Sequence, residues 1–394
     1  MKFSSFVDRI GGEASAAWDL HAEALKAKAA GKDVIVLSIG DPDLSTPTAV
    51  TDQAIKSMLA GDTHYAAVNG REPLRRAIAD KHSNLTGQPF GPENVCVYAG
   101  AQNALYAAAT CLVEHGDEVI VPEPCYVTYE ATIKGPGADW VLIPQPSTNG
   151  FRLNPDDIAR AVTDRTKAIF IVTPSNPTGV MLNHEELTAI SDIAKKHDLW
   201  VVSDEVYGAL TFDEPHISIA GLPGMAERTV TVSSLSKAYA MTGWRLGWAI
   251  GPSELMEHMA RLSLCMLYGM PGFIQEAATT ALTECDADVD FVRETFRRRR
   301  DLTVDRLSKV PGLSVLSPSA GMFLMMDVRK TGLSAREFCV ALFHEVGVCV
   351  LDASPFGPST EGYVRISFAS SDDELIDACK RIETFVRQRN DTAA

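Results

Sequence analysis

Four short apolar segments of this chain end just before residues that can do chemistry. The residues that follow them are Asp204 after position 202, Asn176 after position 172, Ser234, Ser236 and Lys237 after position 232, and Gly100 after position 98. They supply a carboxylate, an amide, two hydroxyls, a primary amine and a glycine turn. Continuous apolar segments are typical of strands buried on both faces. We therefore expect these groups at the ends of strands in one sheet.

One part of this set can bind a phosphate and another can bind an aldehyde. A helix that begins after Gly100 would present unpaired backbone N–H groups, which favour anions. Ser234, Ser236 and Arg245 add two hydroxyls and a guanidinium. Lys237 could form an imine with an aldehyde if burial and neighbouring cations lower its pKa.

The remaining polar side chains match an aromatic heterocycle. Asp204 could hold a protonated ring nitrogen, and Asn176 together with Tyr207 could bond a phenolic oxygen. A phosphate, an aldehyde, a pyridinium and a phenol in one molecule describe pyridoxal 5′-phosphate (PLP). The residues therefore predict PLP as a cofactor.

The elements that must position these residues alternate between strands and helices. Apolar runs at 168–172, 199–202 and 229–232 predict strands, and 184–196 predicts a helix between two of them. This alternation predicts an α/β fold with a mostly parallel sheet, which binds ligands beyond the carboxyl ends of its strands.

The chain ends are expected to form a second, smaller α+β domain. Strand-like segments lie at 313–316, 322–326, 346–351 and 363–368, and helical segments at 14–32, 335–345 and 373–387. We predict a large domain over 46–290 and a small domain built from 1–45 and 291–394. A length of 394 residues agrees with two domains, since domains hold about 100–200 residues each.

The composition excludes several classes of partner. With 36 basic and 51 acidic residues the formal charge is −15, which opposes binding to nucleic acids and to anionic membranes. No run of about 18 apolar residues predicts a membrane span. The eight cysteines include no CxxC pair and the histidines show no metal spacing, so we expect reduced thiols, no metal site and a cytoplasmic location.

The segment Ser234-Leu-Ser-Lys-Ala-Tyr-Ala-Met-Thr-Gly-Trp-Arg245 resembles the lysine signature of the fold-type I, class I and II aminotransferases, which depend on PLP. The other matching motifs are Leu37-Ser-Ile-Gly40-Asp-Pro42, Tyr65 with Gly70 and Leu74-Arg75, Glu123-Pro-Cys-Tyr126, Ser175-Asn-Pro-Thr-Gly179, Asp204-Glu-Val-Tyr207 and Tyr363-Val-Arg365-Ile-Ser367. These motifs occur in the family's order from about residue 37 to 368. The resemblance implies the three-layer aminotransferase fold.

The resemblance also implies a role for each matched residue. Lys237 would form the imine and carry the proton, Asp204 would keep the ring nitrogen protonated, and Tyr207 would act at the phenolic oxygen. The further cofactor contacts that it implies are Gly100, Ala101, Gln102, Tyr126, Asn176, Ser234, Ser236, Arg245 and Tyr65. Tyr65 would reach the cofactor phosphate of a partner subunit, which implies a homodimer with shared sites.

Substrate binding is implied for three residues near the cofactor. Arg365 would clamp the α-carboxylate, helped by Asn176 and the Gly40 backbone. The chain as a whole is most similar to arginine–pyruvate transaminases, which makes an L-amino acid such as arginine and a 2-oxo acid such as pyruvate the expected substrates. Side chains that could read a cationic substrate are Glu130, Trp18, Tyr129 and Tyr268.

Other reactions are possible for the same set of residues. An aspartate- or aromatic-type aminotransferase is one alternative, although Gln102 stands where one aspartate-specific branch has a lysine. A PLP-dependent β-eliminating lyase is the other alternative. A nicotinamide enzyme is disfavoured because no GxGxxG follows a strand, and a PLP-sensing regulator is disfavoured because no basic DNA-binding extension exists.

Overall fold

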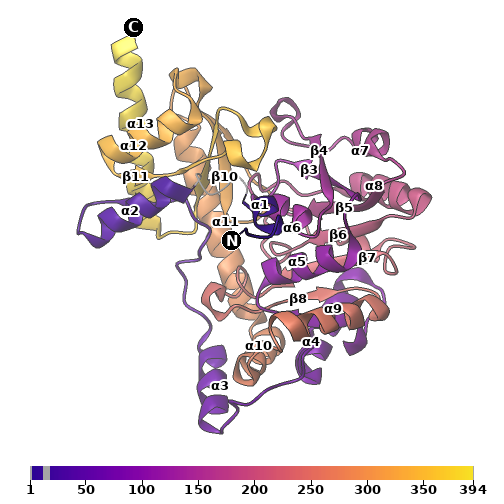
Figure 1. Ribbon diagram of the computed structural model, residues 1–394. Coiled ribbons are helices and arrows are strands. Elements are labelled where there is room, and N and C mark those ends of the chain that lie inside the picture. The colour runs from indigo at the N-terminus through magenta and orange to yellow at the C-terminus, as the bar shows by residue number, and fades with distance from the viewer. Residues whose placement is uncertain (1, 12–17, 394) are drawn as a thin grey trace.

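A seven-stranded sheet forms the centre of the computed structural model, which describes residues 2–11 and 18–393 (Figure 1). Its strands are β2 (Val95–Tyr98), β3 (Glu118–Glu123), β4 (Asp139–Pro144), β5 (Thr166–Val172), β6 (Trp200–Asp204), β7 (Thr229–Ser234) and β8 (Gly247–Ile250). The strand order is β2-β8-β7-β6-β5-β3-β4, and only β8 runs antiparallel to its neighbours. The predicted mostly parallel α/β sheet is confirmed.

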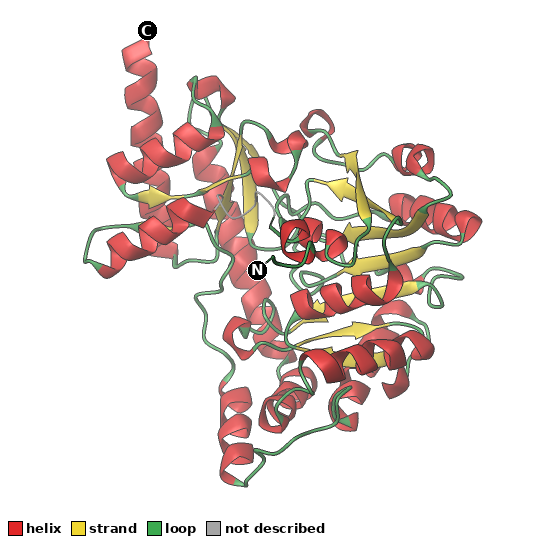
Figure 2. Ribbon diagram, viewed as in Figure 1, coloured by secondary structure: helices red, strands yellow, loops and turns green. Residues whose placement is uncertain are grey.

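Helices cover both faces of this sheet (Figure 2). They are α4 (Glu72–Thr86), α5 (Ala101–Leu112), α6 (Tyr129–Lys134), α7 (Pro155–Ala161), α8 (His184–His197), α9 (Ser253–Met266) and α10 (Gly272–Glu284). Phe170 of β5 packs in the apolar core with α5 and α9, whereas Ile169 and Ile171 pack in a second core with α7 and α8. Successive side chains thus enter opposite cores, which explains the continuous apolar sequence of β5.

A second sheet is built from the C-terminal part of the chain. It is antiparallel, with the order β12 (Leu351–Asp352), β13 (Tyr363–Ser367), β10 (Phe323–Asp327) and β9 (Ser314–Leu316). The helices of this part are α11 (Asp286–Leu307), α12 (Ala335–Val346) and α13 (Asp372–Ala393). Ser334 and Glu337 form a capping box that begins α12, since each side chain accepts a backbone N–H of the other residue.

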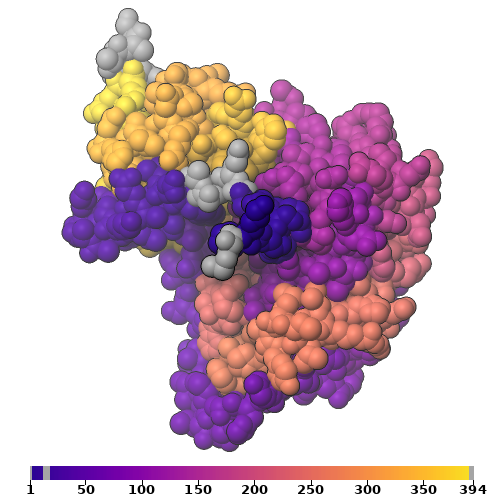
Figure 3. All heavy atoms as spheres, viewed as in Figure 1, coloured from indigo at the N-terminus to yellow at the C-terminus, as the bar shows by residue number. Residues whose placement is uncertain are grey.

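The N-terminal segment packs against this C-terminal part. β1 (Ile35–Val36) pairs in parallel with β11 (Val348–Cys349), and α2 (Asp19–Ala29) also contacts β11. The space-filling view shows α2 directly beside the C-terminal residues, whereas α1 (Phe6–Arg9) lies nearer the large sheet (Figure 3). α3 (Thr48–Leu59) packs against α10.

Two details differ from the expectations. The predicted N-terminal helix over 14–32 is shorter within the described residues, where α2 begins at Asp19, and positions 14–17 lie outside those residues. The strand-like segment predicted at 346–351 is divided between the two-residue strands β11 and β12. The division into 46–290 and 1–45 with 291–394 stays a prediction, and its second boundary falls within the continuous helix α11. No helix in the described ranges is long and apolar enough to cross a membrane.

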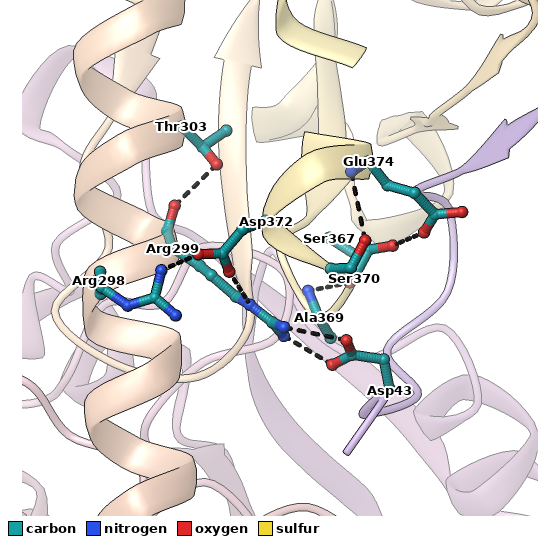
Figure 4. Close-up of polar contacts among 10 residues, drawn as sticks. Asp43, Arg298, Arg299, Thr303, Ser367, Ala369, Ser370, Asp372 and Glu374 are labelled. Carbon is teal, nitrogen blue, oxygen red and sulfur yellow. Dashed lines mark hydrogen bonds and ion pairs between the residues drawn. The ribbon is translucent and has the colours of Figure 1, made fainter. Parts of the chain in front are cut away.

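Arg299 of α11 joins three distant parts of the chain (Figure 4). Its guanidinium donates to Asp43, in the segment before α3, at 2.6 and 2.9 Å. Its Nε donates to Asp372 at the start of α13 at 3.0 Å. Only 5% of Arg299 is exposed, whereas its neighbour Arg298, which also contacts Asp372, is largely exposed. Arg299 therefore fixes the segment that follows Gly40.

Removing this buried cation is expected to destabilise the protein. Arg299→Ala leaves Asp43 and Asp372 without their shared counter-charge, and we expect the free energy of unfolding to fall by about 2 kcal/mol, reduced from the buried-pair range because both carboxylates are partly exposed. Arg298→Ala is the matched control and should cost less than about 1 kcal/mol because that pair is exposed. Urea unfolding measures both variants, and equal losses would contradict this assignment.

Candidate active site

A cavity of about 450 Å³ opens at the carboxyl edge of the large sheet. Its lining combines the ends of β5, β6 and β7 with the start of α5 and with β10, β13 and the segment after β1. The lining residues are Trp18, Ile39, Gly40, Asp41, Ala101, Gln102, Leu105, Tyr126, Val172, Asn176, Asp204, Val206, Tyr207, Ser234, Ser236, Lys237, Thr242, Arg245, Phe323 and Arg365. All predicted site residues line this cavity except Gly100 and Tyr65.

The start of α5 and its surroundings form one anion-binding end of the cavity. Gly100 has a φ of +87°, and no side chain caps the helix that follows it. A Cβ at Gly100 would lie 2.5 Å from Nη2 of Arg245, so only glycine lets this guanidinium approach the helix terminus. Ser234 and Ser236 are buried beside it, and the Ser236 N–H donates to Ser234 Oγ at 3.3 Å. These donors suit a phosphate.

Lys237 lies between this end and the opposite wall of the cavity. Its Nζ donates to the Gly40 carbonyl oxygen at 2.7 Å. Burial, together with the guanidinium groups of Arg365 and Arg245, lowers the pKa of Lys237 to about 8, although Asp41 acts in the opposite direction. Much more of this amine is therefore uncharged near neutral pH than in an ordinary lysine, and the uncharged form can act as a nucleophile or base.

Asp204 is a buried carboxylate at the end of β6. Burial raises its pKa to about 6, and two hydrogen bonds oppose this rise. The Tyr129 hydroxyl donates to Oδ2 at 2.7 Å, and the Val206 N–H donates to Oδ1 at 3.3 Å. Tyr129 is thus a partner of Asp204, not a reader of the substrate side chain as we expected from its position in the sequence.

Tyr207 and Asn176 come together beside Asp204. Burial raises the pKa of Tyr207, while Arg365 and the adjacent Asn176 amide act to lower it. Tyr207 therefore stays a neutral hydroxyl that can donate to an oxygen. Tyr126 is half-buried on the cavity wall, and its ring meets that of Tyr129 edge-on at 6.2 Å.

Arg365 of β13 forms a second anion-binding end. It is 1% exposed, and burial lowers its pKa to about 10. Nη1 donates to Asn176 Oδ1 at 2.8 Å and Nη2 donates to the Ser38 carbonyl at 2.7 Å, while buried Nε has no partner. Within the described residues no carboxylate lies at ion-pairing distance from it. A buried cation without a counter-ion suits an anionic substrate group.

Some predicted residues lie outside this cavity. Tyr65, which was expected to reach the site of a partner subunit, is 85% exposed, and its ring is tilted against that of Tyr268 at a centroid distance of 4.7 Å. Glu130 pairs with Lys134 at 2.5 Å and does not line the cavity. Asp41, Phe323 and Leu105 line the cavity but were missed. Asp41 could have been found from its place beside Gly40, whereas nothing in the sequence pointed to Phe323.

In the parts of the chain that the structure describes, no group of three or more His, Cys, Asp or Glu side chains could hold a metal ion, in the cavity or elsewhere.

The family of the chain follows from comparison with known proteins. The model of the family "aminotransferase class I and II" matches residues 32–382. The chain belongs to this aminotransferase family. The resemblance found in the sequence motifs is thereby confirmed, and so is the three-layer fold.

Individual relatives agree with the family. The aminotransferase is 48% identical to the arginine–pyruvate transaminase of Pseudomonas aeruginosa over 97% of both chains. It is 38% identical to an aspartate aminotransferase of Pyrococcus abyssi over 91% of this chain and 93% of that one. The solved structure of the Thermus thermophilus aspartate aminotransferase with maleate has a TM-score of 0.92 at 34% identity, covering 98% of this chain and 99% of that chain. Aminotransferase activity is supported, and the lyase alternative is not.

The aminotransferase should show an unusually acidic lysine. In ligand-free protein, acetic anhydride labelling of Lys237 should be half-maximal near pH 8, because the amine reacts only when uncharged and its pKa is lowered from 10.5 to about 8. Peptide mass spectrometry after competitive labelling measures this midpoint. A midpoint near 10.5 would show that burial and the two arginines do not perturb Lys237.

Proposed function

We propose that this aminotransferase holds PLP in the cavity and uses it to exchange an amino group between an L-amino acid and a 2-oxo acid by a ping-pong mechanism. The observation that carries the proposal is that Lys237 and Asp204 line one cavity together with two separate anion-binding groups, Arg245 and Arg365. One end suits the cofactor phosphate, and the other suits a substrate carboxylate.

The residues present fit this cofactor. The uncapped start of α5, Ser234, Ser236 and Arg245 supply donors for a phosphate. Ala101 and Gln102 at that start would contribute their backbone N–H groups, and Tyr126 would lie against the ring. The absence of a side chain at Gly100 keeps the space that Arg245 needs. The cavity also holds the carboxylate of Asp204 and the hydroxyl of Tyr207. The carboxylate suits a pyridinium nitrogen, and the hydroxyl suits a phenolic oxygen.

PLP supplies an electron-accepting ring next to a carbonyl carbon through which an amino group can be carried. Asp204, buried and held by Tyr129, would accept the N–H of the ring nitrogen and keep that proton in place. Tyr207 and Asn176 would bond the phenolic oxygen. Lys237 would accept a proton from the substrate Cα at Nζ and return it, which its lowered pKa permits near pH 8.

Arg365 would orient the amino acid. Its guanidinium lies beside Asn176 Oδ1, and its Nε remains without a partner. An α-carboxylate would satisfy that donor and balance the buried charge. With Gly40 on the same wall, this contact would place the substrate Cα near Lys237 Nζ.

Arginine is the amino donor that we propose first, with pyruvate as the acceptor. The support is the relative at 48% identity, whose name gives these substrates. Asp41 and Asp204 are the carboxylates among the described lining residues, and Asp204 is assigned to the cofactor, so Asp41 and the Trp18 indole are available to a cationic side chain.

Gln102 gives less support to an acidic amino acid, such as aspartate, as the amino donor. Its amide donates to Thr132 Oγ1 at 2.9 Å and accepts from Thr128 Oγ1 at 2.6 Å, so it is tied to α6 and brings no positive charge. Aspartate- and aromatic-type activity remains the alternative because other relatives carry those names.

A panel of amino donors tests the proposal. The purified protein, supplied with PLP, should convert pyruvate to alanine with arginine as donor faster than with aspartate or phenylalanine, as chromatography of the products would measure. Lys237→Ala should lower kcat by about 10³-fold or more, because the proton carrier is lost. Lys167→Ala, at an exposed lysine of β5, is the control and should keep full activity. Release of ammonia without an acceptor would instead show a lyase.

We also propose a homodimer with shared sites. Tyr65 is 85% exposed and Leu59 is 84% exposed, and the ring of Tyr65 is tilted against that of half-exposed Tyr268. Large apolar side chains exposed together favour an interface. Light scattering should give twice the chain mass of 42.6 kDa, and Leu59→Glu should lower it by placing a charge in the contact. A fully active monomer would contradict shared sites.

A further inference from the structure

A second buried carboxylate directly follows Asp204. Glu205 and Asp204 are each 5% exposed. Asp204 lines the proposed cofactor cavity, whereas Glu205 lines a separate cavity of about 250 Å³ bounded by α4 and β7. Val206 and Ser234 line both cavities, so the two carboxylates lie on opposite sides of one thin wall.

Both oxygens of Glu205 have hydrogen-bond donors. The Ser203 and Ser218 hydroxyls donate to Oε1 at 2.9 and 2.8 Å. His216 Nε2 lies 2.8 Å from Oε2, and the side chain of His216 is only 4% exposed. Burial by itself would raise the pKa of Glu205, but the charge and hydrogen bond of His216 outweigh it, and the pKa is lowered. Glu205 is therefore a charged group paired with His216.

Two buried carboxylates in consecutive residues repel one another. The charge of Glu205 adds to the burial that raises the pKa of Asp204. A counter-charge and hydrogen-bond donors close to Glu205 limit this repulsion. His216 is the residue in direct contact, and it is held in place by the close backbone of Gly208, where a Cβ would lie 2.9 Å from His216 Cδ2.

The other titratable groups around Glu205 are less able to balance it. From α4, His82 is 6% exposed, burial lowers its pKa, and its Nε2 has no hydrogen-bond partner. Lys81 of α4 pairs with Asp286 of α11 at 2.6 Å. Tyr239, which follows β7, is a neutral hydroxyl because burial raises its pKa. His216 is therefore the main partner that can offset the charge of Glu205.

We propose that His216 is a positioning residue for the aminotransferase reaction: by pairing with Glu205 it balances the second carboxylate, so that Asp204 stays ionised and holds the proton on the cofactor ring nitrogen. This inference rests on the proposed function. It assigns a role in the reaction to a side chain that lies outside the cofactor cavity and touches no substrate.

A cycle of charge-removing variants of the PLP-loaded enzyme tests the role. His216→Gln keeps an N–H donor but leaves the Glu205 charge unbalanced, so kcat measured near pH 6, where Asp204 titrates, should fall about tenfold while KM for the amino acid changes little. Glu205→Gln removes the charge itself and should stay within about threefold of wild type. The double variant, His216→Gln with Glu205→Gln, should be more active than His216→Gln alone. A double-mutant cycle measures this coupling between the two residues.

The pH profile separates this role from a merely structural one. Unbalanced Glu205 would raise the pKa of Asp204, and protonated Asp204 is inactive, so the acid limb of the kcat profile should move to higher pH in His216→Gln. In the double variant it should return to the wild-type position. Loss of packing alone would lower stability without moving this limb. The affinity of the protein for PLP, measured from the absorption of the bound cofactor near pH 6, should also fall in His216→Gln and recover in the double variant.

Each other outcome would overturn the inference. Equal loss in His216→Gln and in the double variant would do so, as would a loss in Glu205→Gln as large as that in His216→Gln. If His216→Gln does not fold, an active double variant with the wild-type acid limb supports the role, and an impaired one refutes it. Wild-type transamination is measured first, so a failure of the proposed function appears there, and a failure of this inference appears only in the variants.

Discussion

The burial of the Arg365 charge is the constraint on which the rest of the site depends. A guanidinium removed from water costs several kcal/mol unless its donors and its charge are satisfied. Here Asn176 and the Ser38 carbonyl accept two donors, and the rings of Phe323 and Phe356 lie 3.9 and 4.9 Å from the guanidinium carbon. These contacts hold the side chain rigidly but leave Nε and the net charge unsatisfied. The protein thus keeps a fixed cation ready for an anion.

The same constraint explains why both ends of the chain are needed. Ser38 and Gly40 come from the segment after β1, Arg365 comes from β13, and Asn176 follows β5. The segment that carries Gly40 is anchored three residues further along the chain, at Asp43 by Arg299, and β1 is anchored by its pairing with β11. A shift of this segment would move the carbonyls that Arg365 and Lys237 contact. Contacts far from the cavity therefore maintain the geometry inside it.

Much of this arrangement follows from local sequence patterns. Asp204, Asn176 and Lys237 were predicted together because strand ends of a parallel sheet meet at one edge. Tyr129 was assigned the wrong task, since whether a helical tyrosine faces the substrate or a neighbouring carboxylate depends on how α6 packs on the sheet. Glu130 and Phe323 show the same limit, because their positions relative to the cavity are set by contacts between elements distant in sequence, which no local pattern encodes.

The overall charge of −15 gives little indication of the electrostatics at the cavity. Its walls hold Lys237, Arg245 and Arg365 against the carboxylates of Asp41 and Asp204, so the interior is cationic although the surface is acidic. Tyr129 and a backbone N–H donate to the buried carboxylate of Asp204, and His216 together with two serine hydroxyls contacts the carboxylate of Glu205 behind it. Consecutive buried carboxylates are tolerable only when each has a separate set of donors on its own side of the wall. Without donors on its side of the wall, the buried carboxylate of Asp204 would take up a proton more readily.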